Sequence, residues 1–358
     1  MPLEKSAWHL YSYLRFMHYV EDIGMELVFI GLILAGMIVT ANLLALRNNK
    51  SEKMVFRWLL FAINLLPLMF GVGLIAMPVD LLRQLFEDSG QLAITAEGVK
   101  AMGPSFVFMA VWGMVTSLVI VQKLLARLIP IEPGSPVHTL ALVFAGYLMG
   151  NTALTLSQGG LEGLADAVEP TSVILFGIQQ LLFAATGFLG VGMFIRRDWR
   201  ELLKRLGIVR PTAGQLLQGV GWIIVLVVLQ FVVGALWLIS NPEQITALED
   251  INSVLLADVD TAAEWLAFAL LAGTGEEILF RGAIQPVFGL WFTSIFFAIV
   301  HVQYGFSIAT LLIVFLAIIL GIIRHRTNTT VAIFVHVGYD FVLGLVTLLE
   351  AFAENFVP

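Results

Sequence analysis

The chain has 358 residues, of which 59% are hydrophobic and only 13% are charged, and its mean hydropathy is +0.93. Soluble domains carry about 25% charged residues, so this composition excludes a water-soluble globular protein and predicts an all-α polytopic membrane protein. The formal net charge of −7 says little, because in a membrane protein the placement of Lys and Arg matters more than their sum. The expected surrounding is the lipid bilayer, and no nucleic-acid partner is expected. The absence of cysteine excludes disulfides, thiolate metal sites and cysteine-protease chemistry.

About ten segments are long and apolar enough to cross a bilayer, since a spanning helix needs about 20 mostly apolar residues. The first follows a mixed polar segment and lacks the basic region and cleavage site of a removable signal peptide, so we expect it to be retained. The eighth and ninth share one apolar run that is broken only near residues 303–305. The predicted spans are residues 24–46, 55–78, 103–125, 137–156, 172–195, 218–240, 262–285, 288–304, 305–323 and 330–349.

The loops between these segments alternate in charge. Lys and Arg gather at 47–57, 123–127, 196–210 and 324–326, whereas residues 157–171 and 241–261 contain neither. Basic loops face the cytoplasm, so both termini are expected outside. The short hydrophilic loops and the lack of cysteine favour a multi-pass protein of a prokaryotic plasma membrane.

Ionisable residues at membrane depth divide the chain. Residues 1–195 form a predicted N-terminal region of five spans with almost no such residues and no assigned role, and 196–210 form a basic cytoplasmic linker. Residues 211–358 hold the intramembrane Glu, His and Asp residues. Such groups are costly in a bilayer and usually mark a functional site.

The first cluster is Glu276 and Glu277, followed by Arg281. On a helix, Glu277 and Arg281 are i and i+4 and can pair, while Glu276 is rotated by about 100° and stays free. A buried, unpaired carboxylate suits a general base near neutral pH. The alternative is that both carboxylates belong to a structural ion pair or face a water-filled cavity.

Two later segments carry histidines. Phe297 lies four residues before His301 and is expected to pack against its ring, and His336 and Asp340 share one helical turn. Each feature alone has a structural alternative, namely an interhelical hydrogen bond for His301 and a His–Asp pair for His336 and Asp340. Together with Glu276 they suit either activation of a water molecule or ligation of a divalent metal such as zinc. Glu276 and His301 lie towards opposite ends of their predicted spans, so a shared site requires short, tilted or displaced helices.

The run Glu276-Glu277-Ile278-Leu279-Phe280-Arg281 closely resembles the EExxxR motif of the CPBP family, the CAAX-prenyl-protease and bacteriocin-processing (Abi) intramembrane proteases. Phe297-x-x-x-His301 is similar to the FxxxH motif of that family, and His336-x-x-x-Asp340 is similar to its HxxxN or HxxxD motif. The motifs occur in the family's order, and the resemblance covers roughly residues 215–350.

The resemblance implies a helical intramembrane protease core in residues 211–358 and an endopeptidase acting on membrane proteins or lipidated, CAAX-type peptides. It implies that Glu276 activates water with help from His301, that His336 and Asp340 stabilise the oxyanion, and that Glu277, Arg281 and Phe297 support the site. The metal is left open, with Glu276, His301, His336 and Asp340 as candidate ligands.

Asp340 stands where many members of the family carry Asn, and an ionised Asp would repel an oxyanion. It is therefore expected to be protonated, to turn towards His336, or to bind a metal. Two other functions are consistent with the sequence, a non-catalytic membrane scaffold that keeps the protease fold and an ion-coupled transporter. A transporter would be favoured by inverted repeats between the two halves of the chain, and the sequence shows none.

Overall fold

The computed structural model describes residues 25, 27–87, 95–157, 173–305 and 307–354. Within these ranges the regular elements are helices, and one isolated β-bridge joins Met193 to Arg197. The first described helix is Leu27–Leu46. The elements that follow are α2 (Lys50–Ile63), α3 (Leu65–Ala76), α4 (Val79–Leu82), η1 (Arg83–Glu87), α5 (Ala96–Ser117), α6 (Val119–Leu125), α7 (Pro136–Leu156), α9 (Val173–Gly190), α10 (Trp199–Leu206), α11 (Ala213–Ser240), α12 (Pro242–Leu255), α13 (Ala262–Glu276), η2 (Glu277–Ile284), α14 (Gln285–Ile299), η3 (Val302–Tyr304), α15 (Ile308–Arg326) and α16 (Thr329–Glu354).

Nine helical stretches of the described chain are long and apolar enough to cross a membrane, which agrees with an integral membrane protein. The sequence predicted about ten, and the difference lies in residues 262–299, which form one helical stretch of 38 residues. A straight helix of that length would extend about 57 Å, nearly twice the hydrocarbon core of a bilayer. Gly289 interrupts it with φ 79° and ψ 169°, so the stretch consists of two differently directed parts.

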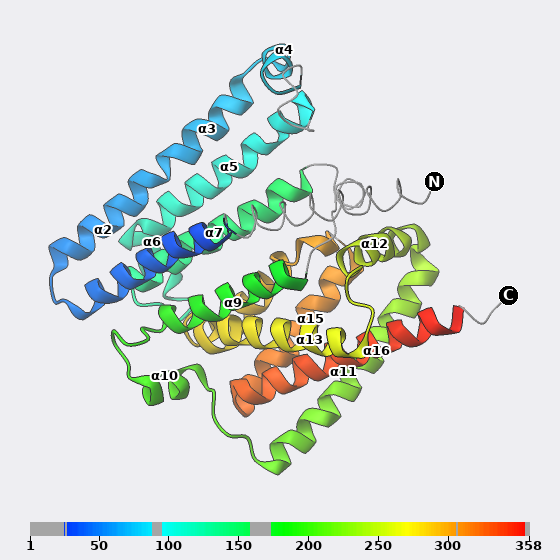
Figure 1. The fold of residues 1–358 in the computed structure, drawn as a ribbon. Helices are drawn as coiled ribbons and strands as arrows, with labels where there is room; N and C mark the ends of the chain where they lie inside the picture. Colours follow the sequence, from blue (N-terminus) through cyan, green and yellow to red (C-terminus); the bar gives the residue numbers. More distant parts are fainter. Residues whose placement is uncertain (1–24, 26, 88–94, 158–172, 306, 355–358) are drawn as a thin grey trace, which may run out of the picture.

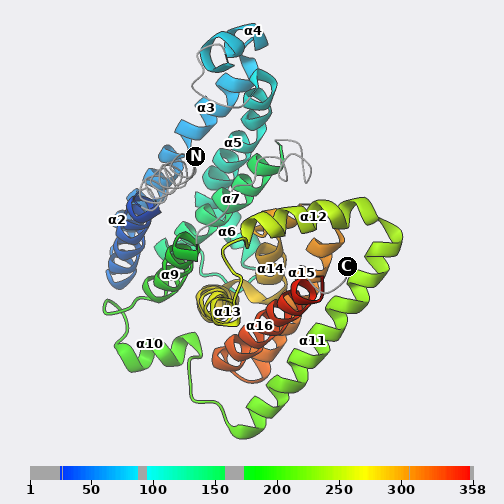
Figure 2. The same ribbon diagram turned by 45° about the vertical axis from the view of Figure 1, so that its right-hand side comes forward.

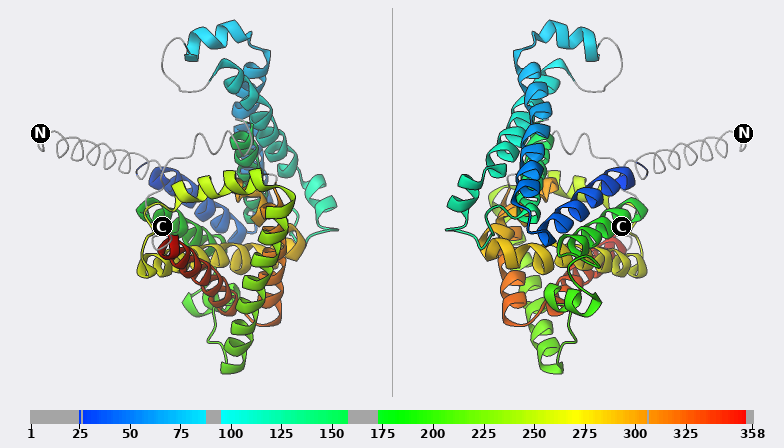
Figure 3. Two further views of the ribbon diagram at one scale, coloured as in Figure 1. Left: turned by 90° about the vertical axis from the view of Figure 1, so that its right-hand side faces the viewer. Right: turned by 90° about the vertical axis from the view of Figure 1, so that its left-hand side faces the viewer.

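The helices are arranged in two groups (Figures 1 and 2). Helices α2, α3 and α5 lie along one side of the molecule, and α13, α15 and α16 are grouped on the other. Contacts of α7 with α14 and of α9 with α13 join the two groups. The views in Figure 3 place α4 and the start of α11 at opposite ends of the molecule. The basic connection before α11 is therefore at the end remote from α4.

An apolar core holds the second group together. Leu226 of α11, Leu316 and Leu320 of α15, and Val331 and Val335 of α16 are buried against one another. Full burial of such a side chain stabilises a soluble protein by about 1.5–3 kcal/mol, but in a bilayer close packing rather than removal from water supplies the gain. This core fixes α16 and the polar residues that it carries.

Two glycines of α13 bring neighbouring helices close. A Cβ atom at Gly273 would lie 2.7 Å from Cγ2 of Val337 in α16, and one at Gly275 would lie 2.6 Å from the backbone oxygen of Gln180 in α9. Small residues at helix contacts allow such an approach of two backbones. The glycines thus place α9 and α16 directly beside the end of α13, where Glu276 and Glu277 lie.

We expect Gly275→Ala to destabilise the protein, because the new methyl group must push the backbone of α9 away from α13. Overpacking of this kind costs about 1–3 kcal/mol. Gly221→Ala in α11 is the matched control, since nothing lies within 4 Å of a Cβ atom there. Alanine is the better helix former by about 0.5–1 kcal/mol, so the control should be neutral or stabilising. Thermal unfolding of both variants in detergent measures the difference, and equal melting temperatures would contradict this account of the packing.

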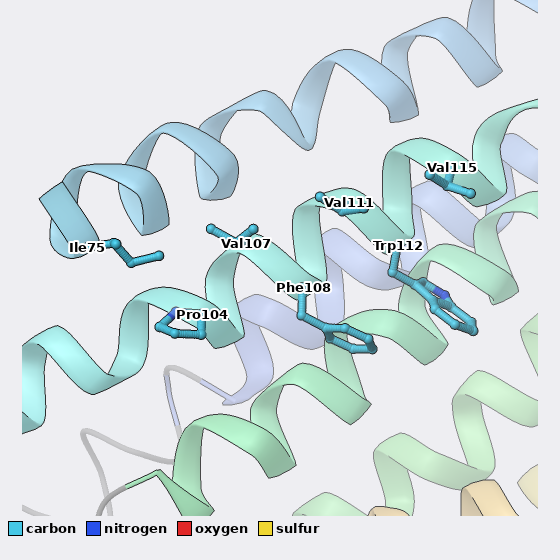
Figure 4. A pocket seen from close by; sticks show the side chains of 7 residues that line it. All are labelled: Ile75, Pro104, Val107, Phe108, Val111, Trp112 and Val115. Carbon is cyan, nitrogen blue, oxygen red and sulfur yellow. The ribbon is translucent and has the colours of Figure 1, made fainter.

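An apolar groove runs along α5 in the first group of helices (Figure 4). It has a volume of about 480 Å³ and is lined by Ile75 of α3 and by six residues of α5, namely Pro104, Val107, Phe108, Val111, Trp112 and Val115. None of these side chains ionises. The groove therefore offers surface for apolar chains but no group for acid–base chemistry, and the candidate reactive residues lie elsewhere.

Candidate active site

The paired glutamates lie where α13 changes its helical form. The helix begins with a capping box, in which Thr261 accepts a hydrogen bond from the backbone of Glu264 and Glu264 accepts one in return, and it ends at Glu276. Glu277 opens the π-helical segment η2. Short π-helical segments widen a helix locally and are frequent at functional sites. The change of helical form directs the two neighbouring carboxylates to different partners.

Glu277 forms a buried ion pair with Arg281. Its Oε2 lies 3.3 Å from Nε of Arg281, and neither side chain is exposed to solvent. The guanidinium carbon of Arg281 also lies 5.0 Å from the centre of the Phe297 ring, within the range of a cation–π contact. The pairing one helical turn apart is the one that the spacing of the two residues predicted.

His336 of α16 lies between two carboxylates. Its Nδ1 is 3.1 Å from Oε1 of Glu277, and its Nε2 is 3.4 Å from Oδ2 of Asp340. The buried carboxylate of Glu277 is therefore shared by Arg281 and His336, which the sequence did not indicate. Of the three expectations for Asp340, the geometry corresponds to the one in which it turns towards His336.

His301 faces Glu276 across a short gap. Its Nδ1 lies 2.6 Å from the backbone oxygen of Phe297, and because a carbonyl can only accept, Nδ1 is the donor. In the neutral ring this leaves the lone pair on Nε2, which lies 3.8 Å from Oε2 of Glu276. The ring of Phe297 packs against that of His301 with 4.4 Å between their centres, as expected from the sequence.

A short helix allows His301 and Glu276 to meet. Helix α14 is broken at Gly289 and ends at Ile299, so His301 follows its last turn and precedes the single turn of η3. The sequence placed the two residues towards opposite ends of long spans. The short segment after Gly289 removes that conflict, so Glu276 of α13, His301 after α14 and His336 of α16 lie at one place.

Gln180 of α9 is a site residue that the sequence analysis missed. Its Nε2 donates to Oε1 of Glu276 at 3.4 Å, and its side chain is buried. Gln180 lies in the predicted N-terminal region, 96 residues before its partner. The signal available in the sequence is the pair Gln179-Gln180 inside an otherwise apolar segment, since buried amides need partners.

The site combines a sealed inner part with a reachable outer part. The side chains of Glu277 and Arg281 are 0% exposed, whereas those of Glu276, His301, His336 and Asp340 are 11%, 19%, 11% and 18% exposed. The inner ion pair can hold the helices in place. The outer four side chains are partly exposed.

The donor atoms do not fit a resident metal ion. His336 directs both ring nitrogens at carboxylates, and His301 donates from Nδ1 to a backbone oxygen. Of the four ring nitrogens of these two histidines, this leaves Nε2 of His301 to bind a metal ion beside Glu276. Within the described part of the chain, no three His, Asp or Glu side chains converge as metal ligands do. Zinc sites in proteins use at least three protein ligands.

This donor arrangement predicts that a chelator does not affect the peptide cleavage that the resemblance implies. Cleavage by protein dialysed against EDTA should stay within about twofold of the rate before dialysis, because no protein ligand set has to be refilled. The measurement is the rate before dialysis, after dialysis, and after addition of Zn²⁺. Loss of activity on dialysis with recovery on Zn²⁺ addition would contradict the arrangement described above.

The comparisons with known proteins agree with the position of this site. The family model of the type II CAAX prenyl endopeptidase Rce1-like proteins matches residues 258–342, a range that contains Glu276, Glu277, Arg281, Phe297, His301, His336 and Asp340. Searches of curated proteins and of solved structures found no match. The match confirms the resemblance of this region to the CPBP family that the three motifs indicated.

Proposed function

We propose that the chain is an intramembrane endopeptidase that cleaves prenylated, CAAX-type or other membrane-associated peptides, a function supported by the match of residues 258–342 to the Rce1-like family model. The observation that carries the proposal is the 3.8 Å approach of Glu276 Oε2 to His301 Nε2, two side chains brought together from separate motifs. A protein that served only as a scaffold would not need a partly exposed carboxylate and an imidazole lone pair that face one another.

In the proposed reaction, the attacking water lies between Glu276 and His301. Two acceptor atoms cannot form a hydrogen bond with one another, but at a separation of 3.8 Å both can lie roughly 2.8 Å from the oxygen of one water molecule, which donates to each. The water donates one hydrogen to Nε2 of His301 and the other to Glu276. As its oxygen attacks the peptide carbonyl carbon, Glu276 takes the proton and then delivers it to the nitrogen of the departing amine.

His336 is the proposed partner of the carbonyl oxygen. Its Nε2 lies 3.4 Å from Oδ2 of Asp340, within ion-pair range only, so Nε2 can turn to a substrate oxygen on which negative charge develops. Glu277 holds the other ring nitrogen and fixes the orientation of the ring. Before the substrate binds, Asp340 keeps Nε2 of His336 in place by its contact with the ring. Arg281 keeps Glu277 in place.

The surroundings of the site favour a substrate that is itself attached to the membrane. Phe280, Phe296 and Phe297 are buried around it, and the helices that carry it are apolar enough to cross a bilayer. A lipid chain on the substrate would concentrate the peptide at the membrane, and a single acyl chain already partitions with a constant of about 10⁴ M⁻¹. The short hydrophilic loops and the lack of cysteine favour the plasma membrane of a prokaryote as its location.

We expect a prenylated CAAX peptide to be cleaved with a kcat/KM at least about tenfold above that of the same peptide without its prenyl group, mainly through a lower KM. The measurement uses purified protein in liposomes and identifies the products by mass spectrometry. Equal values for the two peptides would contradict the prenylated class while leaving an endopeptidase possible. No cleavage of either, or of a panel of membrane-anchored peptides, would leave the scaffold as the function.

A further inference from the structure

A second cavity, lined mainly by charged residues, lies at the basic end of the molecule, outside the candidate active site. It is open, has a volume of about 710 Å³, and lies between the end of the first described helix, the connection before α10, α10 itself and α15. Five cationic side chains line it, together with one carboxylate, that of Glu201. The cations are Arg196, Arg197, Lys204, Arg205 and Arg324.

The positive charge of this cavity is not neutralised by the protein around it. Glu201 is engaged in the capping box of α10, where it accepts from the backbone of Asp198. Among the described residues, no carboxylate comes within ion-pair distance of the five cations, although Glu132 is close enough to favour the charged form of Arg196. Burial, and then the charges of Arg197, Arg324 and Arg196, lower the pKa of Arg205 to about 10. An anion in the cavity would relieve this repulsion.

The arginines are held in place rather than free in solvent. Arg205 donates to the backbone oxygen of Gly282 at 2.9 Å, and Arg324 donates through Nε to that of Arg281 at 3.1 Å. Both acceptors belong to η2, the segment that carries the buried ion pair of the candidate site. Arg197 donates to the backbone oxygen of Val191. A simple signal for membrane orientation would need the charges but not these fixed positions.

Two exposed aromatic side chains belong to the same stretch of chain as Arg196 and Arg197 of the cavity. Phe194 is 74% exposed and Trp199 is 49% exposed, and their rings stack with 6.4 Å between centres. Phe194 has a φ of 54°, a conformation rare for a bulky residue, and its backbone N–H is bonded to the oxygen of Arg197. Exposed aromatic residues beside basic ones are typical of the interface between lipid headgroups and acyl chains.

We propose that this cavity binds the phosphate-bearing headgroup of an anionic phospholipid from the cytoplasmic leaflet. The planar guanidinium groups of Arg205 and Arg324 match the oxygens of a phosphate, and Lys204 adds charge at the exposed rim. The aromatic pair lies where the acyl chains begin. The bound lipid would be linked to Glu277 through two residues, Arg324 and Arg281.

The test measures lipid binding by the purified full-length protein in detergent, using native mass spectrometry. The probes are dioleoylphosphatidylglycerol, which is anionic, and dioleoylphosphatidylcholine, which is zwitterionic and has the same chains. We expect the anionic lipid to bind at least about tenfold more tightly to the wild type. The double variant Arg205→Gln/Arg324→Gln should lose about 10- to 30-fold of that affinity, since each basic residue near the surface contributes about a factor of five.

The matched control is Arg200→Gln/Arg326→Gln, which removes the same charge from α10 and α15 at exposed positions outside the cavity. It should stay within about threefold of the wild type. A loss equal to that of the cavity variant, or equal binding of the two lipids, would overturn the proposal in favour of diffuse attraction.

Two further measurements distinguish loss of lipid binding from loss of folding, and a lipid site from a site for soluble phosphate. Lys204→Glu changes a rim residue without removing either backbone contact to η2, and it should weaken anionic lipid binding by about tenfold with an unchanged melting temperature. Inorganic phosphate at the concentration of the lipid should leave the adduct intact. Displacement by free phosphate at that concentration would identify a site for a soluble anion and overturn the lipid assignment.

Discussion

Replacing Glu276 by glutamine should lower kcat for peptide cleavage by about 10²- to 10⁴-fold, the usual contribution of a general base. Glutamine has nearly the same shape, and its carbonyl oxygen can still accept the hydrogen bond from Gln180. It cannot take the proton of the attacking water. The loss should therefore appear in kcat, with KM and the melting temperature close to those of the wild type.

The control for this prediction is Glu249→Gln, at an exposed position of α12. It removes the same charge from the protein and should leave kcat within about twofold. A rate for Glu276→Gln within tenfold of the wild type would remove Glu276 from the proposed chemistry. The site would then be structural, as the sequence allowed.

The second large effect concerns stability. Arg281→Met should destabilise the fold by about 3–5 kcal/mol, because it leaves the carboxylate of Glu277 buried with His336 as its remaining partner. The double variant Glu277→Gln/Arg281→Met removes both charges and should be more stable than the sum of the two single effects implies. Thermal and denaturant unfolding in detergent give the values.

An exposed ion pair serves as the comparison for Arg281. Arg47 and Glu52 lie 3.2 Å apart with side chains 65% and 37% exposed, so Arg47→Met should cost at most about 1 kcal/mol. Similar effects at the two positions would mean that the ion pair of Glu277 and Arg281 does not hold the helices of the site together.

The contacts that could be predicted from the sequence are those within one helix. Glu277 with Arg281 and His336 with Asp340 are both i and i+4, and helical geometry alone brings such residues together. The order of the three motifs also indicated a resemblance to the CPBP family, and the match of the Rce1-like family model to residues 258–342 supports that resemblance for this region. Likewise, the mostly apolar composition correctly predicted a helical membrane protein.

The contacts between helices could not be predicted in the same way. The approach of His336 to Glu277 depends on how closely α16 packs on Gly273, and that of Gln180 to Glu276 depends on Gly275. Hydropathy fixes the length of a span but neither its neighbours nor its direction. The backbone of Gly289 shows the limit most clearly, since a single left-handed residue decides where His301 lies. The division of the chain at residue 195 stays a prediction.

A double-mutant cycle of Glu276→Gln and His301→Gln tests the central claim most directly. It compares kcat/KM for a prenylated peptide in liposomes among the wild type, both single variants and the double variant. If the two side chains hold one water molecule, the wild type cleaves, each single variant loses activity, and the double variant is little worse than the more damaged single one. Losses that multiply, or a His301→Gln variant as active as the wild type, would contradict a shared site for water activation.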